Sequence, residues 1–227
     1  MNLSPMHYLP LTPLFMVLLV AVFAVVVALI EFGVLTYAYE KLGIGPRYIL
    51  GILLLSLFGS AVNIPVAELP AKEIVVEREI SFFGVGYVVP EVVRQGRTVV
   101  AINLGGALIP MALSLYLLVK KAIYAEAAIG VAVVAFISHL VAKPVPGMGI
   151  AVPTLVLPIV AVVTALVISR KHAAPLAYIA GSMGCLLGAD LMNLGHIQQL
   201  GAPVVSIGGA GISDGVFLTG IVAVLLA

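Results

Sequence analysis

The chain has 227 residues, of which 63% are hydrophobic and 9% are charged, and its formal net charge is +1. Soluble domains carry about 25% charged residues, so this composition argues against a soluble protein and predicts an integral membrane protein. Nucleic acid is excluded as a partner, because phosphate binding requires clusters of Lys and Arg that the sequence lacks. We therefore expect the lipid bilayer to be the main partner of this chain.

Seven apolar runs are each close to the ~20 residues that a helix needs to cross the hydrocarbon core of a bilayer. They are Leu14–Tyr39, Tyr48–Ile64, Val99–Val119, Ala122–Val141, Ile150–Ile168, Pro175–Leu194 and Ile207–Ala227. We expect an all-α polytopic membrane protein of about seven transmembrane helices, in which residues 1–227 form a single integral membrane domain. The tight loops after the third and fifth runs predict antiparallel neighbouring helices.

Residues 66–97 differ from the rest of the chain because they are rich in charged side chains. Within this segment, Glu73–Ile80 and Ser81–Val89 are rich in Val, Ile, Phe and Tyr around Gly84 and Gly86, which is typical of a β-hairpin. The sequence therefore predicts a small β-rich insertion between the second and third helices.

Basic residues in the short loops predict the orientation of the chain. They follow the first, third and fifth runs, as Lys41, Arg47, Lys120, Lys121, Arg170 and Lys171. By the positive-inside rule these loops are cytoplasmic. This orientation places the amino terminus outside, the carboxyl terminus in the cytoplasm and the β-rich insertion on the extracytoplasmic side.

Asp190 and Asp214 are the only two aspartates of the sequence, and both fall within the last two apolar runs. A charged carboxylate inside a bilayer costs about 3 to more than 10 kcal/mol, so such residues usually have a partner or a function. At 1.5 Å per residue, Asp190 lies about 6 Å from the outer end of its helix and Asp214 about 10 Å from the outer end of the next. The two carboxylates are therefore expected at a similar depth.

Other polar side chains are predicted in the same outer layer of the membrane. They are Asn63, Asn103, His139, Asn193 and His196, on the second, third, fourth and sixth helices. Asn193 is three residues from Asp190 and shares its helix face. Gly184 and Gly188 lie on the opposite face, where small residues favour close contact with another helix.

The segment 206–215 contains four glycines in ten residues, which makes a poor start for a helix. Unwound backbone at membrane depth is tolerated where it lines a cavity or is buried in protein. We therefore expect a water-accessible pocket beside Asp214, with Gly211 and Ser213 at its edge.

This glycine-rich segment ending in Asp214, with Asp190 on the preceding antiparallel helix, resembles the GxGD-type intramembrane aspartyl proteases. That group contains presenilin, signal peptide peptidase and prepilin peptidase. The resemblance implies that Asp214 is the aspartate of the GxGD motif, that Asp190 is its catalytic partner, and that the substrate is a membrane-spanning peptide. Gly211 stands three residues before Asp214, where the motif has a glycine directly before the aspartate. The chain is also similar to an uncharacterised family of prokaryotic multi-spanning membrane proteins with GAD and GGAGxxDG segments.

Several functions fit two acidic residues in one membrane layer. The leading hypothesis is proteolysis by two carboxyl groups that share one proton, without a metal ion. A transporter or proton pathway uses the same residue types as a cation site, and a hydrolase could hold zinc with Asp190, Asp214, His139 and His196. A structural pair bonded to Asn103 or His139 is a further alternative. No organic cofactor is expected, because no glycine loop has the strand and helix context of a nucleotide site.

Overall fold

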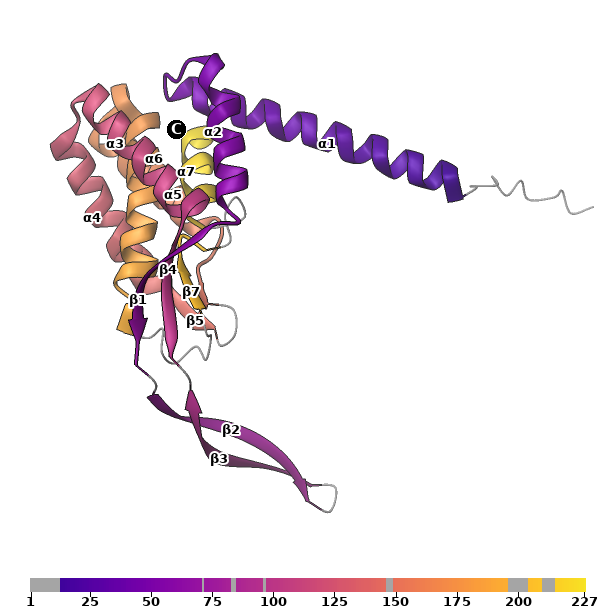
Figure 1. Cartoon of the computed structure of the whole chain (residues 1–227). Coiled ribbons are helices and arrows are strands. Elements are labelled where there is room, and N and C mark those ends of the chain that lie inside the picture. The colour runs from indigo at the N-terminus through magenta and orange to yellow at the C-terminus, as the bar shows by residue number, and fades with distance from the viewer. Residues whose placement is uncertain are drawn as a thin grey trace, which may run out of the picture.

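The computed structural model describes residues 13–70, 72–82, 85–95, 97–145, 149–195, 204–209 and 215–227 (Figure 1). Its longer helices are α1 (Pro13–Lys41), α2 (Pro46–Gly59), α3 (Ile109–Lys121), α4 (Tyr124–Val141), α5 (Val156–Ile168), α6 (Ala173–Cys185) and α7 (Gly215–Leu226). Two π-helical segments, η1 (Leu104–Leu108) and η3 (Leu186–Leu191), and a 3₁₀ turn, η2 (Arg170–His172), adjoin them. The strands are β1 (Asn63–Leu69), β2 (Lys72–Phe82), β3 (Val85–Gln95), β4 (Thr98–Asn103), β5 (Lys143–Val145), β6 (Gly149–Ala151) and β7 (Val204–Ile207).

Four of the described helical stretches are long and apolar enough to cross a membrane. They are Met16–Lys41, Leu104–Lys121, Tyr124–Val141 and Arg170–Leu191. The helices α2, α5 and α7 are apolar but shorter, with 14, 13 and 12 residues. At 1.5 Å per residue even α2 spans only about 21 Å of a hydrocarbon core about 30 Å thick. The protein is thus a mostly helical membrane protein, and the arrangement of seven spans stays a prediction.

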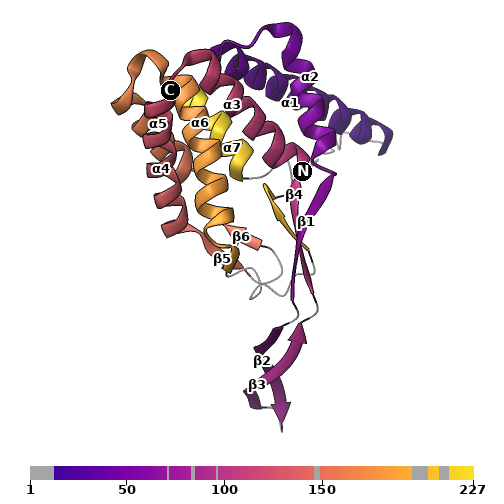
Figure 2. The same ribbon diagram turned by 60° about the vertical axis from the view of Figure 1, so that its left-hand side comes forward.

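Four of the apolar runs that were expected to form membrane spans contain strand residues at one end, which belong to β1, β4, β6 and β7. A sheet of order β1, β4, β7 lies at one end of the helix bundle (Figure 2). β1 and β4 pair antiparallel, with Asn63 opposite Asn103, whereas β4 and β7 pair parallel. The prediction of an all-α membrane domain is therefore wrong at this end. Its β-branched residues, such as Val99, fit a strand, and inter-strand pairing satisfies the backbone as well as a helix does.

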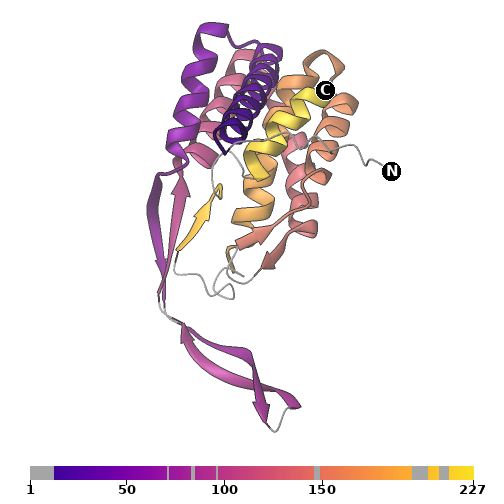
Figure 3. The ribbon, with the colours of Figure 1, turned by 90° about the vertical axis from the view of Figure 1, so that its right-hand side faces the viewer.

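A second pair of strands projects from the sheet end of the molecule, away from the helices (Figure 3). β2 and β3 are antiparallel, from Lys72 opposite Gln95 to Phe82 opposite Val85. The hairpin is longer than the sequence predicted, because its second strand continues beyond Val89 to Gln95. Ser81 and Phe82 belong to its first strand rather than to its second. The side of the membrane on which this hairpin lies stays a prediction.

The helix α6 forms the centre of the bundle and packs against α3, α4, α5 and α7. Its small residues allow α4 to come close, as the sequence predicted. A Cβ on Gly184 would lie 2.6 Å from the Cβ of Val134, and a Cβ on Gly188 would collide with the carbonyl oxygen of Ala135. These glycines therefore hold the end of α6 directly against α4.

The first helix diverges from the bundle, as Figures 1 and 3 show. Most of its side chains from Met16 onward are exposed, whereas Ala38, Tyr39 and Leu42 are buried where the chain turns into α2. The contacts of α1 with the bundle are to α2 and α7. α1 is thus attached through its carboxyl-terminal end, and its apolar surface faces outward.

Candidate functional site

Asp190 lies where the central helix changes its winding. α6 ends at Cys185, and the chain continues as the π-helix η3 to Leu191. π-helical turns are rare and occur frequently at functional sites. Asp190 is half-buried, and its Oδ2 accepts a hydrogen bond from the backbone N–H of Gly208 at 2.8 Å. The structure therefore joins this aspartate to the turn that follows β7.

Gly208 and Gly209 form that turn. Their φ angles are +79° and +51°, in the left-handed region that favours glycine. A Cβ on Gly208 would lie 2.6 Å from the Cβ of Ala107 and 2.8 Å from the carbonyl carbon of Gly106. Glycine at position 208 thus lets the backbone pack against η1 while its N–H reaches Asp190. The sequence pointed to a glycine-rich segment here, but it did not reveal this hydrogen bond.

The fully buried Asn103 joins three parts of the chain. Its Oδ1 accepts a hydrogen bond from the N–H of Gly106 at 2.8 Å. Its Nδ2 donates to the carbonyl oxygen of Ser60 at 2.8 Å and to Oδ1 of Asn63 at 3.0 Å. The Ser206 hydroxyl donates to the same Asn63 oxygen at 2.6 Å. Side chains from β1, β4 and β7 therefore form one connected network.

The positions of these residues differ from the sequence prediction. Asn63 and Asn103 were expected on transmembrane helices, but Asn63 is the first residue of β1 and Asn103 the last of β4. They meet because they are register partners in an antiparallel pair. Sequence reasoning assigned no role to Ser206, whose hydroxyl reaches the network because β7 pairs beside β4.

Asn193 lies close to Asp190, but its amide serves the backbone. The side chain is buried, and its Nδ2 donates to the carbonyl oxygens of Gly188 and Ala189, both at 2.9 Å. Carbonyl groups at a helix end have no partner within the helix and need one from elsewhere. Asn193 thus stabilises the end of η3 and supports the backbone that carries Asp190.

The other predicted site residues are not brought into this network by the described part of the chain. His139 is half-buried on α4, and its Nδ1 is buried without a hydrogen-bond partner among the described residues. Asp214, Gly211 and Ser213 lie outside the described residues, as does His196. The carboxyl pair of the leading hypothesis therefore stays a prediction.

Gly215, the first residue of α7, lies against the same helix as Asp190. A Cβ on Gly215 would lie 3.9 Å from Sγ of Cys185 and 3.1 Å from Cγ2 of Val152. Cys185 precedes Asp190 by five residues, roughly one turn of π-helix. Gly208 is thus bonded to η3 and Gly215 lies near the end of α6, on the two sides of the segment 210–214.

No group of three His, Cys, Asp or Glu side chains is placed to hold a metal ion among the described residues. The zinc hypothesis required four side chains, and two of these, Asp214 and His196, fall outside the described part. The geometry that the structure offers is a half-buried carboxylate, a backbone N–H donor beside it and a strand that leads to it. A carboxyl group in such a position can act as a proton donor or acceptor.

Comparison with known protein families assigns the chain to a family. The family described as "Protein of unknown function (DUF1614)" matches residues 57–226. The chain belongs to this family. The match begins near the end of α2, so the sheet, η1, η3 and α3 to α7 all lie within the family domain.

The family match is compatible with the resemblance to prokaryotic multi-spanning membrane proteins. No curated protein and no solved structure matches the chain, so the resemblance to intramembrane proteases has no support from these comparisons. The argument for a function therefore depends on the site itself.

Proposed function

We propose that the protein is an intramembrane aspartyl endopeptidase in which Asp190 and Asp214 are the catalytic pair. The observation that carries the proposal is the path of β7. This strand is at the edge of its sheet among the described strands, since it pairs with β4 alone. It runs directly into Gly208, whose N–H contacts Asp190. A peptide that added to this edge through main-chain hydrogen bonds would extend toward the carboxylate.

The contacts of Gly208 and Gly215 support the pairing of the two aspartates. Gly209 follows the residue that bonds Asp190, and Gly215 packs near Cys185, one turn earlier on the same helix. Asp214 directly precedes Gly215 in the sequence. The proposal places its carboxyl group within one water molecule of Asp190.

The short helices support a hydrated site inside the membrane. The strand β1 follows α2, and the strand β7 precedes α7. Because both helices are shorter than the hydrocarbon core is thick, these parts of the chain cannot cross it as helix alone. Strand and turn backbone at membrane depth must be buried in protein or line a water-filled cavity. Hydrolysis needs water beside the scissile bond, and the proposal puts that water in a cavity beside Asp190.

In the proposed reaction one carboxyl group is ionised and the other protonated, since two charges at this separation are unfavourable. The carboxylate removes a proton from water while the water oxygen bonds to the peptide carbonyl carbon. The protonated carboxyl group donates its proton to the carbonyl oxygen. As the tetrahedral intermediate collapses, the C–N bond breaks and the amine nitrogen takes the proton that the first carboxyl group removed from water. A hydroxyl group of the intermediate returns its proton to the second carboxyl group, so the pair again shares one proton.

The proposed arrangement has seven spans, with the amino terminus outside and the carboxyl terminus in the cytoplasm. The connections α1–α2, α3–α4 and α5–α6 carry the basic residues, and they lie at the end of the bundle away from the sheet (Figures 1 and 2). Positively charged connections favour the cytoplasmic side. Asp190 and the sheet are then in the outer part of the membrane, and the hairpin of β2 and β3 is extracytoplasmic.

The test is a cleavage assay with the purified full chain in liposomes that contain a single-pass peptide labelled at both ends. We expect Asp190→Asn and Asp214→Asn each to lower the cleavage rate about a thousandfold or more. Asn keeps an oxygen that can accept the hydrogen bond from Gly208, so the first variant retains this contact. Glu31→Gln is the matched control, because it neutralises an exposed carboxyl group on α1. Cleavage that survives in either aspartate variant contradicts the proposal.

A cation or proton pathway is the second candidate. The winding change from α6 to η3 beside an acidic side chain favours it, because discontinuous helices commonly form ion sites in transporters. This alternative predicts ion flux into proteoliposomes that Asp190→Asn abolishes. The peptidase predicts peptide cleavage without coupled ion flux, so the two measurements separate the candidates.

A further inference from the structure

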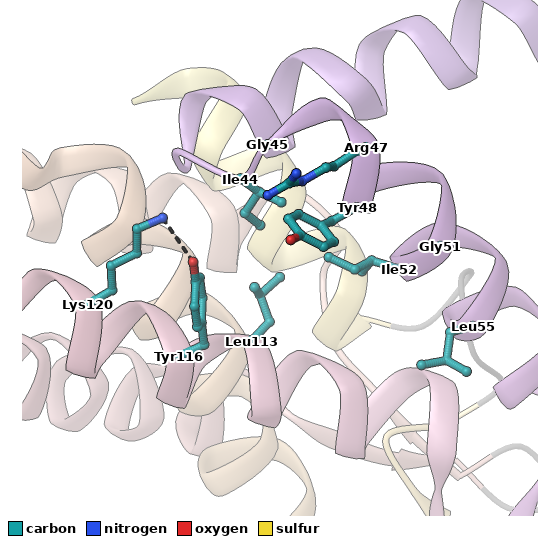
Figure 4. A pocket seen from close by; sticks show the side chains of 10 residues that line it. All are labelled: Ile44, Gly45, Arg47, Tyr48, Gly51, Ile52, Leu55, Leu113, Tyr116 and Lys120. Carbon is teal, nitrogen blue, oxygen red and sulfur yellow. Dashed lines mark hydrogen bonds between the residues drawn. The ribbon is translucent and has the colours of Figure 1, made fainter.

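A groove lies between α2 and α3, where residues from Ile44 to Leu55 face residues from Leu113 to Lys120 (Figure 4). Its volume is about 740 Å³, within the range of roughly 300 to 1,000 Å³ that is common for small-molecule sites. The α2 residues that line the groove come before residue 57, where the match to the family begins. Neither residue of the proposed catalytic pair is among the described residues that line the groove. The groove is thus a separate feature of this chain.

One end of the groove carries cations and aromatic rings (Figure 4). The guanidinium of Arg47 lies 4.7 Å from the ring centre of Tyr48. Nζ of Lys120 donates to the hydroxyl of Tyr116 at 2.9 Å and to the carbonyl oxygen of Gly43 at 3.0 Å. The two cations therefore lie on opposite walls of the same opening, each beside a tyrosine.

These cations have no acidic partner among the side chains that the structure describes. The ion pair found in that part of the chain joins Arg97 and Glu68, near the sheet. Lys121 is a third cation near this end of the groove. Its Nζ would lie 3.6 Å from a Cβ on Gly43, whose carbonyl oxygen accepts the hydrogen bond from Lys120. Positive charge without a counterion at a membrane surface favours an anionic ligand.

The remainder of the groove is apolar. Ile52 and Leu55 line it from α2, and Leu113 lines it from α3. Gly51 leaves space between these side chains, because a Cβ added there would meet nothing within 4 Å. A ligand that fits both ends needs a charged head and a hydrocarbon chain.

We propose that this groove binds an anionic glycerophospholipid, with its phosphate at Arg47 and Lys120 and an acyl chain along Gly51 and Leu55. The guanidinium suits the phosphate because its N–H groups form paired charge-assisted hydrogen bonds with oxygen atoms. Basic pockets between transmembrane helices are known to bind acidic lipid head groups on the cytoplasmic side. The predicted orientation places this end of the bundle on that side.

The test places the full chain in nanodiscs with equal amounts of phosphatidylglycerol and phosphatidylcholine, and then counts the retained lipids by native mass spectrometry. We expect the wild-type chain to retain phosphatidylglycerol about tenfold or more over phosphatidylcholine, since two cations contribute. The double variant Arg47→Gln, Lys120→Gln is expected to lower this preference to about twofold or less. Arg170→Gln with Lys171→Gln removes the same charge from another loop and is expected to keep the preference.

A second pair of variants tests the apolar part of the groove. Gly51→Leu adds a side chain on the groove wall, where a Cβ has open space, and is expected to lower the retention of both lipids. Gly33→Leu adds the same side chain to α1, where a Cβ also has open space, and is expected to retain lipid as the wild-type chain does. Each variant is first shown to elute from a size-exclusion column at the same volume as the wild-type chain and to give the same circular dichroism spectrum.

Several results would overturn the proposal. Equal retention of both lipids by the wild-type chain would show that the cations are ordinary interfacial anchors. Displacement of phosphatidylglycerol by glycerol 3-phosphate alone would identify a soluble phosphate ligand. Dimers that Gly51→Leu disrupts would identify the groove as a contact between two copies of this chain.

Discussion

Replacing Gly208 with Ala tests whether the turn after β7 presents its N–H to Asp190. The substitution has two physical effects, because Gly208 has a φ of +79° and because its Cβ would meet Ala107 at 2.6 Å. The substitution Gly43→Ala distinguishes the cost of the left-handed φ angle from the cost of the steric clash. The φ of Gly43 is +82°, but a Cβ there would meet only Nζ of Lys121, at 3.6 Å, which is ordinary contact with a flexible side chain.

The expected magnitudes follow from these two positions. A left-handed conformation costs a residue with a Cβ roughly 1 to 2 kcal/mol, so Gly43→Ala is expected to lower the free energy of unfolding by that amount. At position 208 the methyl group also forces the turn away from η1, and such overpacking costs about 1 to 3 kcal/mol more. Gly208→Ala is therefore expected to cost about 2 to 5 kcal/mol in total.

The assay is unfolding of the purified variants in mixed micelles with increasing denaturing detergent, followed by circular dichroism. Peptide cleavage is measured on the same samples under native conditions. We expect Gly208→Ala to lose both stability and cleavage, because the displaced turn no longer donates to Asp190, whereas Gly43→Ala keeps cleavage. Equal losses of stability in the two variants would refute the packing of this turn against η1.

Two further predictions concern buried contacts and use the same unfolding assay. Gly188→Ala is expected to lower the free energy of unfolding by about 1 to 2 kcal/mol, because collision with the carbonyl oxygen of Ala135 exceeds the helix-propensity gain. Gly51→Ala is the control, because a Cβ there has open space, and it is expected to raise the free energy of unfolding by up to about 1 kcal/mol. If Gly188→Ala changed the free energy of unfolding as Gly51→Ala does, close packing of α4 against the end of α6 would be contradicted. Asn103→Leu is expected to cost about 3 kcal/mol or more by leaving buried polar groups unpaired, against about 1 kcal/mol for the exposed Asn63→Ala. Similar costs at the two asparagines would contradict a central role for Asn103.

Composition and helical periodicity were enough to predict the helices that cross the bundle. The run Ala122–Val141 corresponds closely to α4, and the small residues Gly184 and Gly188 were assigned to a helix contact that the structure contains. Such features are local, because residues three and four apart on a helix share a face whatever surrounds them. A glycine on that face permits close approach by any neighbouring helix.

The ends of the apolar runs could not be predicted in the same way. A short apolar segment fits a strand as well as a helix, so residues 99–103 of β4 and Ile207 of β7 were included in predicted membrane spans. Their strand conformation depends on pairing between segments about 40 and 100 residues apart. Asn63 and Asn103 were expected in one polar layer on two helices, whereas the structure joins them by a hydrogen bond through strand register.

For the site, the sequence by itself determined that Asp190 is an unusual charge in an apolar helix, because its cost in a bilayer is evident from composition alone. Tertiary structure decided what contacts it. The N–H of Gly208 reaches Asp190 only because β7 pairs with β4 and the glycine turn packs against η1. These contacts join segments distant in the chain, and their free energy depends on shape and register that no local pattern records.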